Sequence, residues 1–195
     1  MERIILPTVK AMNNEGRTFK GCLYFGLMLT SDGPKVIEYN CRFGDPETQA
    51  VLPLLRSDLI ELMLAVENGT LEDCPIEFSS EASCCLVLAS GGYPEKYEKG
   101  KLIIFEDLPD NVEVFHAGTK RSDLGYITSG GRVLGITAVR ATLDEAVCAA
   151  YDAAEHIRFD KMYFRNDIGR MALRQTISLV ASLLSEKRLD GDPKN

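Results

Sequence analysis

The stretch Lys35–Gln49 holds the residue types best suited to chemistry in this chain of 195 residues. Its first part reads as a strand in which Glu38, Asn40 and Arg42 share one face, because side chains alternate along a strand with a period of two. The other face carries apolar residues, namely Ile37, Tyr39, Cys41 and Phe43. Mg²⁺ prefers oxygen ligands and is usually held by carboxylates together with substrate phosphates. Glu38 and Asn40 therefore suit a metal site, and the alternative is a polar strand face in solvent.

After this strand, Gly44 permits a tight change of direction, and Asp45 and Glu47 bring two more carboxylates near Arg42. A guanidinium can grip a carboxylate or a phosphate in a forked geometry, so Arg42 is a candidate for contacting a substrate. Asp45 and Glu47 would then shape the same end of the site. The alternative is an internal salt-bridge cluster that holds the loop, and the two roles are compatible.

The literal string Val36-Ile-Glu-Tyr-Asn-Cys-Arg-Phe-Gly-Asp-Pro-Glu-Thr-Gln49 closely resembles the signature of the glycinamide ribonucleotide synthetases (phosphoribosylamine–glycine ligases), an ATP-grasp family of purine biosynthesis. Five further blocks resemble the family and occur in its order. They are Met1-Glu-Arg-Ile-Ile-Leu-Pro-Thr8, Gly21-Cys-Leu-Tyr-Phe-Gly-Leu-Met28, Phe115-His-Ala-Gly-Thr-Lys120, Gly130-Gly-Arg-Val-Leu-Gly135 and Arg165-Asn-Asp-Ile-Gly169. Ordered agreement of this kind is more specific than any single motif.

The resemblance implies a magnesium (or manganese) site at Glu38 and Asn40, with ATP as the co-substrate. It implies that Arg42 is catalytic and also binds substrate, and that Asp45 and Glu47 bind substrate. The implied reaction joins glycine to 5-phosphoribosylamine through a glycyl phosphate, with cleavage of ATP.

A second implied substrate contact lies at Gly131 and Arg132, in the turn that begins at Gly130. Such a turn can present backbone N–H groups to a phosphate or a carboxylate. A bare Gly-Gly is most often only a turn, so the substrate role here is what the resemblance implies.

The resemblance also implies substrate contacts at Arg165 and Asp167. In this block Phe164 stands where the family has Tyr, and Asn166 replaces its Lys. His116 is assigned no catalytic role, because a lone histidine is more often structural and nothing nearby in the sequence supplies an obvious partner.

Charge and hydropathy narrow the class of protein. Lys and Arg number 22 against 29 Asp and Glu, for a formal charge of −7, which argues against a general nucleic-acid surface. No apolar run approaches the roughly 20 residues that cross a bilayer, and residues 1–7 contain no long apolar signal core. We therefore expect a cytoplasmic protein without nucleic-acid or membrane partners.

The six cysteines form no Cys-x-x-Cys pair, and several lie among apolar strand residues. Reduced, buried thiols are expected here rather than zinc ligands or disulfides.

Periodicity and turn signals predict the elements that must position these residues. Helices are expected over 2–13, 47–55, 57–69, 142–157 and about 173–187, followed by a polar tail over 188–195. Strands are expected over 21–30, the first part of 35–49, 82–90, about 102–105, 112–117, 126–128 and 132–140. Ser57 or Asp58 should cap one helix, and Thr142 to Glu145 forms a capping box for another.

The predicted fold class is α+β, with a domain boundary in the polar stretch 72–81. Residues 1–78 are expected to form the C-terminal, metal-bearing part of an ATP-grasp module. Residues 79–195 are expected to form the ligase's C-terminal domain, small, mostly antiparallel and packed with helices, plus the polar tail. No glycine-rich loop with a following lysine stands before the hairpin over 21–40, so we expect the resemblance to cover the C-terminal portion of the family alone.

Two functions are consistent with this sequence. The first is a portion of the ligase that needs the missing N-terminal portion as its partner and is inactive by itself. The second is a non-catalytic binding or assembly module derived from the ligase.

Overall fold

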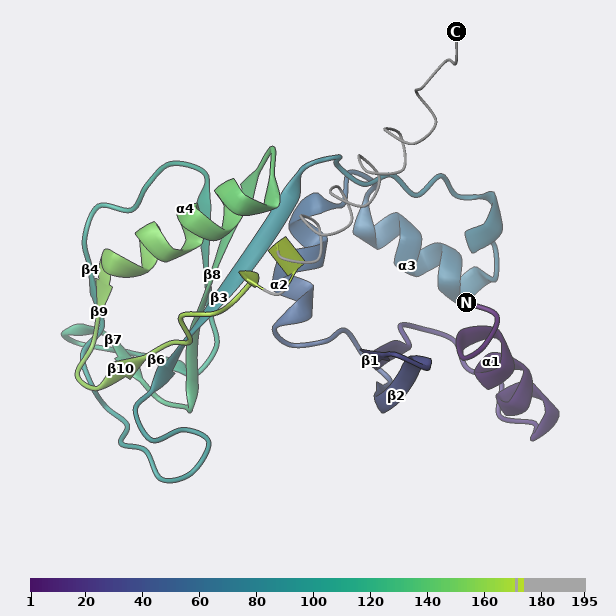
Figure 1. Ribbon diagram of the computed structural model, residues 1–195, viewed down its shortest axis with the longest axis horizontal. Helices are drawn as coiled ribbons and strands as arrows, with labels where there is room; N and C mark the ends of the chain where they lie inside the picture. Colours follow the sequence, from purple (N-terminus) through teal and green to yellow (C-terminus); the bar gives the residue numbers. More distant parts are fainter. Residues whose placement is uncertain (171, 174–195) are drawn as a thin grey trace, which may run out of the picture. The chain divides into compact units, whose positions relative to one another are not determined.

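The computed structural model describes residues 1–170, 172 and 173, and the chain divides into two compact units (Figure 1). Unit 1 is Met1–Ser79 and unit 2 is Ser80–Asn195. The helix expected from about Leu173 to Lys187 and the polar tail lie outside the described residues, apart from Leu173 itself.

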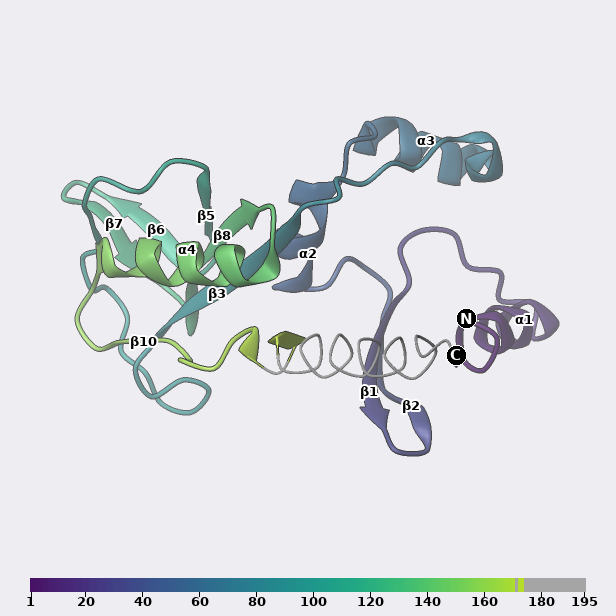
Figure 2. The ribbon, with the colours of Figure 1, turned by 45° about the horizontal axis from the view of Figure 1, so that its top comes forward.

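Unit 1 begins with helix α1 (Ile5–Asn14). Pro7 lies in its first turn, where a missing N–H breaks no helical hydrogen bond. The predicted hairpin follows as strands β1 (Tyr24–Thr30) and β2 (Gly33–Asn40), which pair antiparallel (Figure 2). β2 ends at Asn40, so the predicted alternation of faces does not extend through Phe43. Cys41 and Arg42 form a bend that leads into the following loop.

The rest of unit 1 is helical. Helix α2 (Glu47–Val51) continues as a 3₁₀ turn, η1 (Leu52–Leu54), so that Pro53 again falls near a helix start. Helix α3 (Leu59–Asn68) begins at Asp58, whose side chain accepts hydrogen bonds from two backbone N–H groups, and a short 3₁₀ turn, η2 (Leu71–Asp73), follows it. Gly69 ends α3 in the left-handed region at φ 73°, which explains the glycine there.

Unit 2 is built on two nine-residue strands, β3 (Ala82–Ser90) and β8 (Arg132–Arg140), which pair antiparallel. β10 (Met162–Tyr163) and β5 (Val112–His116) flank them in the order β10-β3-β8-β5. Helix α4 (Leu143–Glu155) crosses one face of this sheet (Figure 1). The predicted capping box is present at its start, where Thr142 and Glu145 bond each other's backbone N–H groups.

Two further antiparallel pairs complete unit 2. β4 (Ile104–Phe105) pairs with β9 (Ile157–Arg158), and β6 (Thr119–Ser122) forms a hairpin with β7 (Gly125–Thr128). Strands β6, β9 and β10 were not among the expected ones. Together these elements confirm the α+β class with a mostly antiparallel second half.

The two units differ in how much apolar surface they bury. In unit 2 the sheet and α4 enclose a core that includes Leu86, Leu88, Leu134 and Ile136, each at most 1% exposed. The face of α4 that meets them consists largely of alanines, which let the helix lie close to the sheet.

All residues of unit 1 are described. Among its apolar side chains, Ala65 is the one that is buried. Large apolar side chains on its hairpin and helices stay exposed, among them Leu6, Val9, Leu27, Met28, Leu29, Ile37, Ile60, Met63 and Leu64. An exposed apolar surface of this extent is unusual for an isolated globular unit. No helix in the described part of the chain has the length and apolar content that a bilayer crossing requires.

Two leucine-to-alanine substitutions test this division. Leu86→Ala empties a fully buried position, and we expect it to lower the free energy of unfolding of unit 2 by about 2–5 kcal/mol. Leu64 lies in unit 1 and is 58% exposed. Leu64→Ala should change the free energy of unfolding of unit 2 by less than about 0.5 kcal/mol. Native-state hydrogen exchange of the β3 and β8 amides measures both. Equal losses from the two substitutions would contradict the placement of the core.

Candidate functional site

The predicted metal ligands lie side by side at the end of β2. The Asn40 amide Nδ2 donates to Glu38 Oε1 over 3.0 Å, with Glu38 exposed and Asn40 half-buried. A carboxylate and an amide oxygen on one strand face are the donor types that Mg²⁺ prefers, so the two residues fit a magnesium ion with open positions left for phosphate and water. No cluster of three or more His, Cys, Asp or Glu with metal-binding geometry occurs among the described residues.

The side chain of Glu38 lies across Gly26 on the neighbouring strand. The two residues are paired, and a Cβ atom built on Gly26 would lie 2.8 Å from Glu38 Cγ. The register shifts directly beyond this pair, which leaves Ile37 as an extra residue on β2, and such bulges re-aim the side chains beside them. The sequence signal was an isolated glycine within a strand, a mark of close approach.

Tyr24 lies near both Glu38 and Glu47. It pairs with Asn40 across the hairpin, and its hydroxyl lies close to the Glu47 carboxylate. Partial burial raises the pKa of Tyr24, and the charges of Glu47 and then Glu38 raise it further. The structure thus brings the loop residue Glu47 towards the strand residue Glu38, which sequence reasoning did not foresee. Tyr24 itself was missed, because nothing in a strand sequence marks a phenol as the partner of a later carboxylate.

Arg42 and Asp45 each have a local partner. The Arg42 guanidinium donates through Nη1 to the carbonyl of Phe43 at 2.9 Å, and Asp45 Oδ1 accepts from Gln49 Nε2 at 2.9 Å. Among the described residues Arg42 forms no ion pair with Asp45 or Glu47. The alternative of a salt-bridge cluster around Arg42 is therefore not what the structure shows, and its guanidinium stays exposed.

Beside Arg42 lies an apolar groove of about 600 Å³ within unit 1. The side chains of Phe43, Leu59, Met63 and Val66 line it, with Arg42 at its polar margin. Met63 is also one of the exposed apolar side chains named above.

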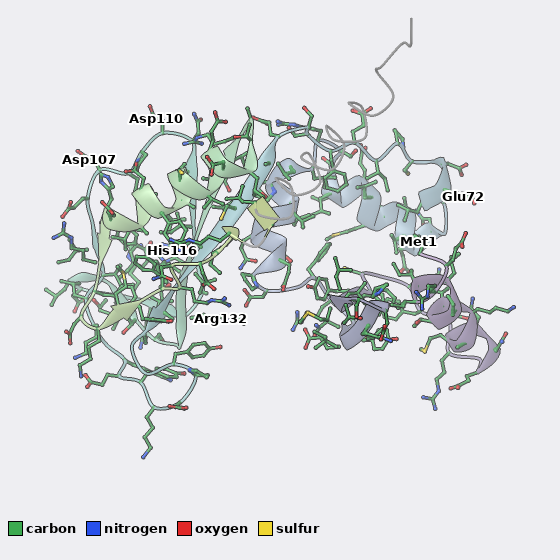
Figure 3. All side chains as sticks on the ribbon, viewed as in Figure 1. Met1, Glu72, Asp107, Asp110, His116 and Arg132 are labelled. Atoms are coloured by element: carbon green, nitrogen blue, oxygen red, sulfur yellow. The ribbon has the colours of Figure 1, made fainter. Side chains whose placement is uncertain are left out.

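In unit 2, Gly131 and Arg132 lie where β8 begins, opposite the end of β3. Gly131 is buried and Arg132 is half-buried, and Figure 3 shows the Arg132 side chain at this end of the sheet. The N–H of Gly130 donates to the carbonyl of Gly118 at 3.1 Å. That group is thus used within the fold and is not directed to a ligand.

Arg165 and Asp167 bind each other. Arg165 donates through Nε to Asp167 Oδ1 at 2.8 Å and through Nη2 to Oδ2 at 2.6 Å, a two-pronged ion pair. The hydrogen bonds to Arg165 lower the pKa of the Asp167 carboxyl, and the same bonds raise the pKa of Arg165. Tyr151 on α4 secures this segment, because its hydroxyl donates to the Arg165 carbonyl and accepts from the N–H of Ile168.

His116 has neutral surroundings. Its Nδ1 lies 2.9 Å from the Thr119 hydroxyl, and its ring lies 4.4 Å from that of Tyr126, centroid to centroid. The labelled side chain in Figure 3 lies within unit 2. These contacts describe a histidine at the end of β5 that packs against the β6–β7 hairpin.

All six cysteines are unpaired. Of them, Cys84 alone is buried, and burial with the neighbouring Cys85 raises its pKa to about 11. The prediction of buried thiols was wrong for Cys41 and Cys148, which are exposed, because the one lies beyond the end of β2 and the other on α4 away from its alanine face.

Two models of one protein family match the chain. The model described as "Phosphoribosylglycinamide synthetase, ATP-grasp (A) domain" matches residues 1–48, and "Phosphoribosylglycinamide synthetase, C domain" matches residues 83–171. Together they account for more than half of the chain. The chain belongs to the phosphoribosylglycinamide synthetase family.

Individual relatives agree with this family. The chain is 50% identical over 171 residues to the bifunctional purine biosynthetic protein ADE1 of Schizosaccharomyces pombe, covering 87% of this chain and 22% of that protein. It is 46% identical over 175 residues to the phosphoribosylamine–glycine ligase of Chlorobaculum tepidum, covering 88% and 41%. The chain therefore spans less than half the length of these synthetase relatives.

Solved structures show the same fold. The crystal structure of phosphoribosylamine–glycine ligase from Thermotoga maritima matches with a TM-score of 0.70 and 36% identity, over 82% of this chain and 39% of that one. The biotin carboxylase subunit of pyruvate carboxylase matches with a TM-score of 0.54 at 16% identity, over 80% and 35%. The second likeness is one of fold alone.

The ion pair in the family's Arg165 block has a measurable consequence. With Arg165 in place, the pKa of Asp167 should lie below the ordinary range of an aspartate, and Arg165→Gln should return it to that range. Because a lowered folded-state pKa stabilises the fold above the unfolded pKa, this contribution is present at neutral pH and is lost as the pH falls through the folded value. Carbon-13 NMR titration of the Asp167 carboxyl measures the shift.

The matched control is Arg158→Gln, at an arginine that pairs with Glu106 over 3.5 Å instead. That substitution should leave the Asp167 titration unchanged. An unshifted Asp167 in the unmodified chain would show that the pair does not persist in solution.

Proposed function

We propose that this chain serves as part of a phosphoribosylamine–glycine ligase in purine biosynthesis, where glycine is joined to 5-phosphoribosylamine at the expense of ATP. A glycine carboxylate oxygen bonds to the γ-phosphorus of ATP and ADP leaves. The amine nitrogen of phosphoribosylamine then bonds to the carbonyl carbon of glycyl phosphate, and phosphate leaves as the amine loses a proton. The observation that carries the proposal is the family match over both units, with Glu38 and Asn40 adjacent on β2.

Residues of unit 1 hold the metal–phosphate side in this proposal. Glu38 and Asn40 supply oxygen ligands to Mg²⁺ or Mn²⁺, which when bound neutralises phosphate charge during phosphoryl transfer. Gly26 leaves the space in which the Glu38 side chain lies. Tyr24 orients Glu47 and keeps its own proton, since its pKa is raised by partial burial and by the two carboxylates.

Arg42 is the proposed catalytic and substrate-contacting cation. Its exposed guanidinium has no carboxylate partner within the described residues, which leaves it available to an anionic group of the substrate. Asp45 and Glu47 line the same loop and complete the substrate end.

Residues of unit 2 contribute the remaining substrate contacts. Arg132 and the buried Gly131 are proposed to face an anionic substrate group. Arg165 and Asp167, already bonded to each other, are proposed to act as a neutral pair that accepts and donates hydrogen bonds.

The proposed reaction also requires polypeptide that the relatives contain outside the part matched by this chain. The chain spans 41% or less of the relatives described, and the exposed apolar surface of unit 1 supports a partner surface that covers it. Phosphoryl transfer depends on positioned cationic groups around the phosphates, and Arg42 is the one such group that this proposal assigns in unit 1. The six unpaired cysteines suit a cytoplasmic setting.

The substitution Glu38→Gln tests the metal assignment. It is made in an enzyme assembled from this chain and the portion of a relative that lies outside the matched sequence. Loss of the ligand charge should lower kcat by roughly 100-fold or more. Stability should barely change, because Glu38 is exposed. The measurement is the steady-state rate across a series of Mg²⁺ concentrations.

The control is Glu15→Gln, a matched change at an exposed acid of unit 1, which should leave the rate unchanged. A near-normal rate for Glu38→Gln at saturating Mg²⁺ would overturn the assignment.

The second test asks whether ligation activity requires polypeptide beyond these 195 residues, and it begins with the 195 residues alone. We expect no ADP release that depends on both glycine and phosphoribosylamine, and recovery when the uncovered part of a relative is added. A coupled ADP assay with and without that addition measures this. Full activity from the 195 residues alone would refute the requirement. Tight assembly without any ligation would favour a non-catalytic assembly module instead.

A further inference from the structure

Ser90 holds two successive carbonyl groups of the turn that leads into β8. Its backbone N–H donates to the Gly131 carbonyl at 2.8 Å, and its hydroxyl donates to the Gly130 carbonyl at 2.9 Å. Ser90 is the last residue of β3 and is only 3% exposed. Both carbonyl oxygens are therefore directed to Ser90, and their negative ends are turned away from any anion that approaches the turn.

Tyr93 packs on Gly131 in the same place. A Cβ atom on Gly131 would lie 2.6 Å from Tyr93 Cε2, so the ring occupies the space that a side chain would need. The N–H of Tyr93 donates to the Ser90 carbonyl at 3.0 Å, and Tyr97 packs edge-on against the ring. The Tyr93 hydroxyl has no partner within the part of the chain that the structure describes, so its ring contact is what links it to the turn.

Two features fix the turn from its other side. Gly118 lies so close that a Cβ atom on it would be 2.6 Å from Gly130 Cα, and its N–H donates to the Arg132 carbonyl at 2.8 Å. The register of β3 and β8 shifts between Leu88 and Ala89, which leaves Val133 as an extra residue beside Arg132. A bulge at this position re-aims the arginine.

We propose that Ser90 and Tyr93 are positioning residues that hold the Gly130–Arg132 turn so that Arg132 meets an anionic group of the substrate. The proposal rests on the proposed function, which assigns Arg132 to substrate. A turn needs only its own backbone bonds, whereas this one is held by a buried hydroxyl, an aromatic ring and a second glycine backbone. Such support of the backbone is typical of functional sites, where the direction of a side chain, here Arg132, must be fixed.

The first test is kinetic and uses the assembled ligase. Ser90→Ala and Tyr93→Ala should each raise the KM of one substrate by about 2- to 10-fold, the range expected for one lost hydrogen bond or ring contact. kcat should change less. The same substrate's KM should rise in Arg132→Ala. A rise for phosphoribosylamine identifies its phosphate as the group bound, and a rise for glycine identifies its carboxylate.

A double-mutant cycle separates positioning from general stability. If Ser90 and Tyr93 act through Arg132, neither substitution should raise that KM further when Arg132 is already alanine. Effects that persist in the Arg132→Ala background would overturn the proposal. Tyr93→Phe keeps the ring and should behave as the unmodified enzyme. Ser129→Ala, at an exposed serine in the same loop, should leave the KM unchanged.

The second test needs no substrate and no further polypeptide. In this chain alone, Ser90→Ala and Tyr93→Ala should speed hydrogen exchange of the Gly118 and Gly130 amides by about 2- to 10-fold, and Ser129→Ala should not. Unchanged exchange would show that the two residues do not hold the turn. Absence of ligation in the unmodified assembly would instead defeat the proposed function, so the two failures are distinguishable.

Discussion

The pairing of β3 with β8 is the interaction on which unit 2 depends. These two strands form the centre of the sheet, with β5 and β10 at their outer edges and α4 across one face. Because they run antiparallel, the end of β3 meets the start of β8. Ser90 therefore lies against the Gly130–Arg132 turn although 40 residues separate Ser90 from Gly130. The same pairing that builds the core also places Gly131 and Arg132 against the end of β3.

The candidate residues of unit 1 and those of unit 2, each taken by itself, rely on a glycine in the same way. In unit 1 Gly26 leaves space for Glu38, and in unit 2 Gly131 leaves space for the Tyr93 ring. In each case a side chain from a neighbouring segment fills the position of the missing Cβ atom, which gives that side chain a fixed surface to rest on. Neither glycine has a left-handed backbone, so the need is one of room and not of conformation.

Sequence reasoning predicted the long elements well, because their signals are local. The continuous apolar runs of β3 and β8 and the capping box at Thr142 require no distant partner to be recognised. Two-residue strands such as β9 and β10 exist only through their pairing, and the Tyr24–Glu47 contact depends on how a loop folds back on a hairpin. Spacing alone left Glu38 and Asn40 open to a solvent-exposed reading. The family resemblance drew attention to them, and the structure added Gly26 and Tyr24 around them.

The uncovered apolar surface of unit 1 has a further consequence inside a cell. Chaperones and proteases recognise exposed leucine and isoleucine side chains as the mark of an unfinished protein, and small differences in stability change abundance several-fold. Unit 2 encloses a core within its described residues and leaves fewer large apolar side chains exposed there. The exposed Leu27, Ile37 and their neighbours make residues 1–79 the part of the chain most open to such recognition. Proteolytic turnover would then begin in that half of the chain.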